Sequence, residues 1–151
     1  MAGPGYEKSV MVALLPTTRD WTHLALPHLT LVYVGEIDAV RPTLYNELAK
    51  DAMTAADSFG NLDIPVVGVD EFGGGDQPTV DALRLVPTTQ LLALRRIFDR
   101  YNGSQWTEFD PHVTVGPVGS ATVVPDTILF DRISVCWGKE MVSYLFRQPD
   151  R

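Results

Sequence analysis

The chain has 151 residues, 45% of them hydrophobic and 21% charged, which is the composition of one globular domain and excludes a disordered tail or a coiled coil. Its 19 acidic residues outnumber 12 basic ones and give a net charge of −7, which disfavours broad binding to a phosphate backbone unless the positive charges gather in one place. The single cysteine, Cys136, excludes an intramolecular disulfide and a thiolate metal cluster. With no signal peptide and no membrane-spanning stretch, we expect residues 1–151 to form a single-domain, cytoplasmic monomer.

Runs of apolar and β-branched residues that end at proline, glycine or polar residues predict the strands of this domain. They lie at residues 9–15, 28–34, 62–72, 79–86, 112–115, 127–137 and 141–146. The glycine-rich segment 73–78 connects two strands and lacks a following Lys-Ser/Thr, which predicts a hairpin loop and not a phosphate cradle.

Two segments have the three-and-four spacing of apolar residues that predicts amphipathic helices. The first has Pro42 in its first turn and is capped by Asp38 or a neighbour, and its apolar face consists of Leu44, Leu48, Ala52, Ala55 and Phe59. The second is capped by Thr88 or Thr89 and carries Leu91, Leu94, Ile97, Phe98 and Tyr101. Because the helices fall between groups of strands without strict alternation, we expect an α+β fold with a mostly antiparallel sheet.

Two of the three histidines have nearly the same surroundings, in Pro27-His28-Leu29-Thr30-Leu31 and in Pro111-His112-Val113-Thr114-Val115. Side chains two residues apart project from the same face of a strand, so each motif presents an imidazole beside a hydroxyl, with apolar residues on the other face. One such motif is an ordinary strand start, but its repetition in a chain with so little histidine indicates a functional pair.

The residue types suit phosphodiester hydrolysis without a metal or other cofactor. One histidine can take a proton from water while the other gives a proton to the departing oxygen, in an order that the sequence leaves open. The hydroxyls of Thr30 and Thr114 can donate to the phosphoryl oxygens that hold charge in the transition state.

Two His-x-Thr-x motifs separated by a helix, a hairpin and a second helix resemble the 2H phosphoesterase superfamily, which includes 2′-5′ RNA ligase-like proteins and RNA cyclic phosphodiesterases. The resemblance implies a bilobal, pseudo-twofold fold with two outer helices around a central cleft. It also implies that His28, Thr30, His112 and Thr114 hydrolyse a small phosphodiester, such as a nucleotide or RNA-end 2′,3′-cyclic phosphate. Several RNA-processing relatives carry an arginine shortly after the second motif, where this chain has Gly116-Pro117-Val118, which disfavours an extended RNA grip.

Other functions fit the same motifs. The chain could hydrolyse cyclic nucleotide or cyclic oligonucleotide signals, or hold a phosphorylated ligand without turnover. Metal binding by the motif histidines, with Asp110 or Glu36 as a further ligand, is disfavoured because no close ligand cluster exists. His23 is interpreted as a solvated loop residue.

Aromatic and basic residues could supply further substrate contacts. Trp21, Trp137 and Tyr144 are the candidates for stacking on a base, whereas strand alternation places Tyr33 on the face opposite His28. Local positive charge could come from Arg84, Arg132 and Lys139.

Overall fold

The computed structural model describes residues 7–22, 24–74, 77–104 and 108–148. His23 and part of the glycine-rich hairpin loop lie outside these residues. The described chain contains one antiparallel sheet, whose strands agree with the predicted runs to within two residues at each end. They are β1 (Ser9–Pro16), β2 (Leu29–Glu36), β3 (Leu62–Gly74), β4 (Gln77–Leu85), β5 (His112–Pro117), β6 (Thr127–Trp137) and β7 (Glu140–Leu145). The α+β fold class is confirmed.

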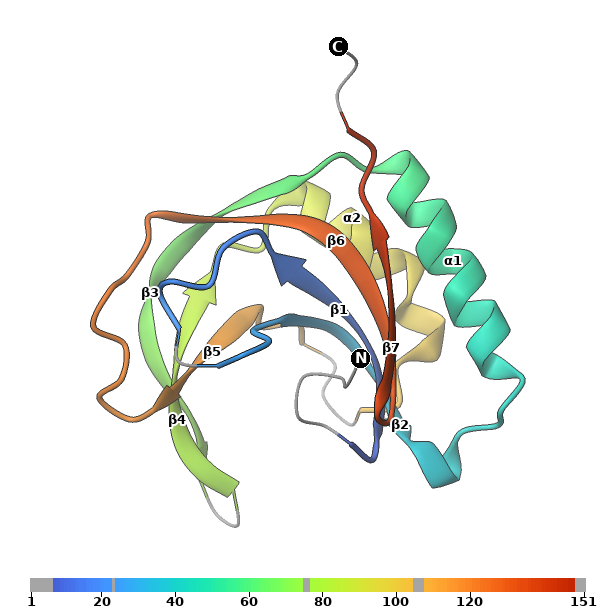
Figure 1. Ribbon diagram of the computed structural model, residues 1–151, viewed down its shortest axis with the longest axis horizontal. Coiled ribbons are helices and arrows are strands. Elements are labelled where there is room, and N and C mark those ends of the chain that lie inside the picture. Colours follow the sequence, from blue (N-terminus) through green and yellow to red (C-terminus); the bar gives the residue numbers. More distant parts are fainter. Residues whose placement is uncertain (1–6, 23, 75–76, 105–107, 149–151) are drawn as a thin grey trace.

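The strand order is β1-β2-β5-β4-β3-β6-β7, and β6 pairs in addition with β1 (Figure 1). Residues 127–130 of β6 pair with β3, and residues 130–137 pair with β1. Because β6 pairs with both β3 and β1, strands β1 to β6 form a closed ring that leaves β7 at an edge. The β3–β4 hairpin confirms that the glycine-rich loop connects two antiparallel strands.

Two helices, α1 (Leu44–Ser58) and α2 (Thr89–Ile97), pack on one side of the sheet and on each other (Figure 1). Apolar residues of both helices and of the strands form one core between the two layers. Thr88 caps α2 as expected, because its hydroxyl accepts a hydrogen bond from the Leu91 amide at 3.1 Å. Neither helix of the described residues is long and apolar enough to cross a membrane.

The start of α1 and the end of α2 differ from the prediction. Asp38 lies in a separate 3-10 turn, Ile37–Ala39, and Pro42 precedes the helix, so neither belongs to the first turn of α1. Ile97 of the predicted apolar face is 40% exposed, because α2 ends there. The chain continues as a 3-10 turn, Asp99–Tyr101, in which Tyr101 is buried as predicted.

Gly103, just after this turn, lies against the backbone of β2. Its amide donates to the carbonyl of Tyr33 at 2.9 Å, and an added Cβ would lie 1.8 Å from the carbonyl oxygen of Val34. This close approach holds Gly103 against β2, at the start of the connection that leads to β5.

We predict that Gly103→Ala lowers the free energy of unfolding by on the order of 2 kcal/mol or more, because backbone must move to admit the methyl group. Urea unfolding followed by circular dichroism measures this change. Gly68→Ala is the matched control, since nothing lies within 4 Å of a Cβ there. Equal midpoints for the two variants would contradict the prediction.

Candidate active site

The two histidine motifs meet where β2 contacts β5. These strands are antiparallel and share a single residue pair, Leu29 with Val113. In this register the residues on either side of the pair face each other, so His28 lies opposite Thr114, and Thr30 lies opposite His112. The two motifs are thus related by a local twofold axis through the Leu29–Val113 pair.

Strand alternation then decides which face carries the polar groups. Leu29 and Val113 are fully buried in the main core, on the helix side of the sheet. The four polar side chains therefore project from the opposite face, which we call the cleft face. Thr30 confirms this direction, because its hydroxyl lies 3.7 Å from the sulfur of Met11, a residue outside the main core.

His112 is held from two sides. The Nδ1 atom of His112 lies 2.8 Å from the carbonyl oxygen of Asp110. Because a carbonyl oxygen can only accept a hydrogen bond, Nδ1 carries the proton. In the neutral ring, Nε2 is then the atom that can accept a proton. The ring of Phe72 in β3 stacks on the imidazole with centroids 4.1 Å apart and planes 10° apart. Arg84 bonds the carboxylates of both Asp70 and Asp110 and thereby joins β3, β4 and the segment before β5.

His28 has a different environment from its partner. It is 7% exposed, and burial lowers the pKa of its imidazole to about 4. A backbone hydrogen bond to Leu26 acts against this shift, and the charge of His112 adds to it. At neutral pH the His28 ring is therefore uncharged and able to accept a proton.

A hollow of about 480 Å³ lies beside one half of this cluster. Besides Thr30 and His112, its lining includes the rings of Tyr33, Phe72 and Phe109. Tyr33 also lies on the cleft face, contrary to the prediction, because the β1–β2 register shifts between Val12 and Ala13. Thr30 pairs with Ala13 and Tyr33 pairs with Met11, and both partners lie outside the main core. Sequence reasoning missed both Phe72 and Phe109. Phe72 reaches the motif from β3, two strands away from β5, and Phe109 lies in the irregular segment just before His112.

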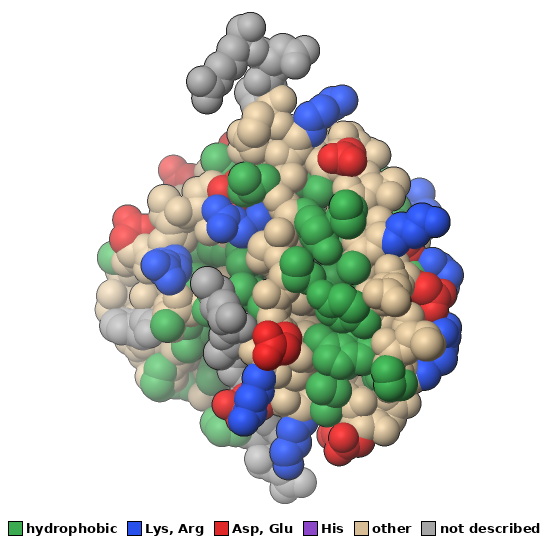
Figure 2. All heavy atoms as spheres, turned by 45° about the vertical axis from the view of Figure 1, so that its right-hand side comes forward, with side chains coloured by type: hydrophobic (Ala, Val, Ile, Leu, Met, Phe, Trp, Pro, Cys, Tyr) green, Lys and Arg blue, Asp and Glu red, His purple; other side chains and the backbone are tan. Residues whose placement is uncertain are grey.

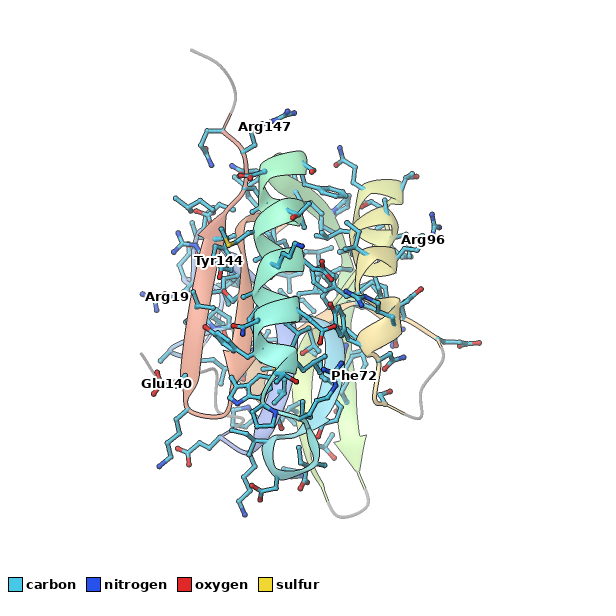
Figure 3. The ribbon with its side chains drawn as sticks, turned by 90° about the vertical axis from the view of Figure 1, so that its right-hand side faces the viewer. Arg19, Phe72, Arg96, Glu140, Tyr144 and Arg147 are labelled. Carbon is cyan, nitrogen blue, oxygen red and sulfur yellow. The ribbon has the colours of Figure 1, made fainter. Side chains whose placement is uncertain are left out.

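The three aromatic residues expected to stack on a substrate lie elsewhere. Trp21 is 5% exposed and belongs to the main core. Trp137 and Tyr144 lie on the helix-side face of β6 and β7, and Figure 3 shows Tyr144 on β7 beside α1. Trp137 packs edge-on against Tyr45 of α1, with ring centroids 5.7 Å apart. Trp137 and Tyr45 line an apolar hollow of about 420 Å³, within a band of apolar side chains that Figure 2 shows. None of the three joins the histidine cluster.

The predicted basic residues divide between two places. Arg84 and Arg132 lie on the cleft face, in β4 and β6, whereas Lys139 lies in the exposed turn between β6 and β7.

Cys136 shares the cleft face with Met11 and Met141, and burial raises the pKa of its thiol to about 12. That thiol stays protonated at neutral pH and is a poor nucleophile.

The carboxylates considered as metal ligands are not placed for that role. Asp110 is bonded to Arg84, and Glu36 ends β2 about 26 Å from His28 at the usual rise per strand residue. Among the described residues no three His, Cys, Asp or Glu side chains gather into a possible metal site.

No model of a known protein family matches the sequence, and no curated protein matches it significantly. Solved structures do match. Usb1 of Kluyveromyces marxianus aligns over 88% of this chain and 81% of its own, with a TM-score of 0.60 and 10% identity. TT0787 of Thermus thermophilus aligns over 92% and 95%, with a TM-score of 0.58 and 14% identity. LigT of E. coli, solved with 3′-AMP, aligns over 93% and 99%, with a TM-score of 0.56 and 16% identity.

The chain has the 2H phosphoesterase fold. The architecture expected from the two motifs is therefore confirmed over most of the chain. These sequences share so few identical residues that the arrangement of His28, Thr30, His112 and Thr114 must be judged from the geometry of this chain itself.

The burial of His28 predicts that the folded chain loses stability in acid. Its pKa is about 4 in the folded chain and about 6.5 in the unfolded chain, so between these values only the unfolded chain binds the proton. Stability is lost as the pH falls through this window, by on the order of 3 kcal/mol from this one group.

Urea titrations of the wild type and of His28→Gln at pH 7, 6, 5 and 4 measure the effect. The advantage of the wild type over the variant should shrink toward pH 4, because glutamine does not titrate. A difference that stays constant with pH would show that His28 is not buried as an uncharged ring.

Proposed function

We propose that the chain is a phosphodiesterase that opens a 2′,3′-cyclic phosphate, on a nucleotide or at an RNA end, by acid–base catalysis with two histidines. The observation that carries this proposal is the antiparallel register at Leu29 and Val113. In this register two imidazoles and two hydroxyls project from one face around the residue pair. This arrangement suits a reaction in which water attacks phosphorus from one side and the ribose oxygen departs from the other side.

Each histidine has a role in the proposed reaction. His28, uncharged because of its burial, takes the proton from water as the water oxygen bonds to phosphorus. The bond from phosphorus to one ribose oxygen breaks, and protonated His112, which is more open to solvent, gives that oxygen its proton. Thr30 and Thr114 donate to the non-bridging oxygens, which carry the growing negative charge.

The aromatic hollow beside Thr30 and His112 supports a nucleoside on the phosphate. Stacking of a base on an aromatic ring contributes about 1–3 kcal/mol. Phe72 and Phe109 offer such rings. The LigT structure in the comparison contains 3′-AMP, a nucleoside monophosphate of the kind that opening a cyclic phosphate produces.

The proposal is tested by incubating the purified chain with adenosine 2′,3′-cyclic phosphate and with short RNA that ends in a cyclic phosphate, and identifying products by mass. Cyclic dinucleotides and 2′-5′ dinucleotides complete the set. A linear monophosphate formed from the 2′,3′-cyclic ends supports the proposal. Binding without turnover would instead identify a phosphate-binding module, and turnover of cyclic dinucleotides alone would identify a signal hydrolase.

We predict that His28→Ala and His112→Ala each remove nearly all turnover, because each deletes one of two proton transfers. The double variant should be little worse than either single one, since groups that act as a unit are not additive. Thr30→Ala and Thr114→Ala should lower kcat by about ten- to a thousandfold, as expected for losing one donor to developing charge. Measured kcat/KM with the cyclic substrate checks these values, and full turnover by either histidine variant would contradict the mechanism.

We also predict that turnover persists after dialysis against EDTA, because the imidazoles of His28 and His112 supply both the acid and the base. Initial rates before and after chelation, with and without added Mg²⁺, Mn²⁺ or Zn²⁺, provide the measurement. Loss of the rate in EDTA and its return with one of these ions would favour the metal interpretation.

A further inference from the structure

A second, smaller hollow lies beside the first histidine motif and contains two arginines. It has a volume of about 180 Å³. Leu26 and Pro27, the residues just before His28, form one wall, and Arg19 and Arg132 reach it from the β1–β2 connection and from β6. The aromatic hollow lies beside His112 and Thr30, so the two hollows flank the histidine cluster at different places.

Strand register gives the distance from Arg132 to the cluster. Arg132 pairs with Leu15 of β1, and the neighbouring pair of Leu14 with Leu29 places Leu15 beside His28. Two steps of about 4.8 Å between strands therefore separate the Cα atoms of Arg132 and His28 by about 10 Å. An arginine side chain together with one ribose–phosphate unit spans such a distance.

Both guanidinium groups retain capacity for an anion. Asp131 accepts from Nε and Nη2 of Arg132 at 2.8 and 3.0 Å, which uses two of its five donors and fixes the plane of the group. Arg19 donates to the carbonyl oxygen of Ala25, a neutral acceptor, so that bond fixes the side chain without cancelling its charge. In a chain with a net charge of −7, this hollow combines the positive charge of Arg19 with directed donors of Arg132, whose own charge Asp131 offsets.

We propose that this arginine hollow binds a second phosphate group, next to the one that reacts at His28 and His112. The inference rests on the proposed function and makes it narrower, because the substrate is then an oligonucleotide end of at least two nucleotides and not a cyclic mononucleotide. A guanidinium fork matches phosphate oxygens in shape as well as in charge. Arg19 and Arg132 thereby supply the grip that Gly116-Pro117-Val118, which contains no arginine, does not supply.

The experiment compares two dinucleotides that both end in a 2′,3′-cyclic phosphate. One, ApA, has a normal charged phosphate between its nucleosides, and the other has a neutral methylphosphonate there. The wild type should prefer the charged one by about 10- to 100-fold in kcat/KM, as for hydrogen bonds to a charged group. The preference should fall toward 1 in Arg19→Ala/Arg132→Ala, be partly retained in Arg19→Lys/Arg132→Lys, and weaken with added salt.

Arg96→Ala is the matched control. Arg96 is an exposed arginine of α2, and Figure 3 shows it on the opposite side of the molecule from Arg19. This variant removes one positive charge without touching the hollow, so it should keep the preference of the wild type. If the double alanine variant fails to fold by circular dichroism, Arg19→Ala alone carries the test, because Arg19 lies in an exposed connection.

The outcomes separate this inference from the proposed function. Turnover of both dinucleotides at equal kcat/KM would overturn the second phosphate site and leave the cyclic phosphodiesterase intact. Absence of turnover would count against the phosphodiesterase, and calorimetric binding of the same two dinucleotides would still test the hollow. Equal dissociation constants for the charged and neutral forms would then overturn it.

Discussion

The candidate site depends on one contact between strands, the pairing of Leu29 with Val113. These two apolar residues are fully buried, and their burial fixes the face on which the four polar neighbours project. Shifting either strand by one residue would move a histidine and a threonine into the core and two apolar side chains into the cleft. The hydrophobic effect therefore selects the register, and the register brings the two motifs together.

The same motif has different chemistry in the two halves because the surroundings differ. His28 precedes its strand and is buried, which keeps its ring uncharged, whereas His112 is half-buried between Phe72 and the Asp110 carbonyl. In the proposed reaction, the uncharged His28 suits the role of base, and His112, held by the Asp110 carbonyl and more open to solvent, suits the role of acid. A repeated sequence thus gives two unequal partners, because burial and stacking are properties of the packed fold.

The strands, the helices and the paired motifs could be read from the sequence because they depend on local patterns. The missed aromatics could not, since Phe72 reaches His112 only through the pairing of β3 with β4 and of β4 with β5. The position of Trp137, a candidate that lies away from the histidine cluster, could have been predicted from the sequence pattern. In β6, Ile133, Val135 and Trp137 alternate with Arg132, Ser134 and Cys136, so counting by twos from the buried residues assigns Trp137 to the core side.

The same alternation explains how an acidic chain can offer an anion site. It places Arg84 and Arg132 on the cleft face, where each is held by aspartates: Arg84 by Asp70 and Asp110, and Arg132 by Asp131. These carboxylates fix the guanidinium groups but offset their charge, so little of the attraction for a substrate comes from net charge. Selectivity then rests on directed donors, which the shape of a phosphate group can satisfy and a diffuse anionic surface cannot. Under the proposed function, directed donors would select the phosphodiester end, while the net charge of −7 repels the rest of a nucleic acid polymer.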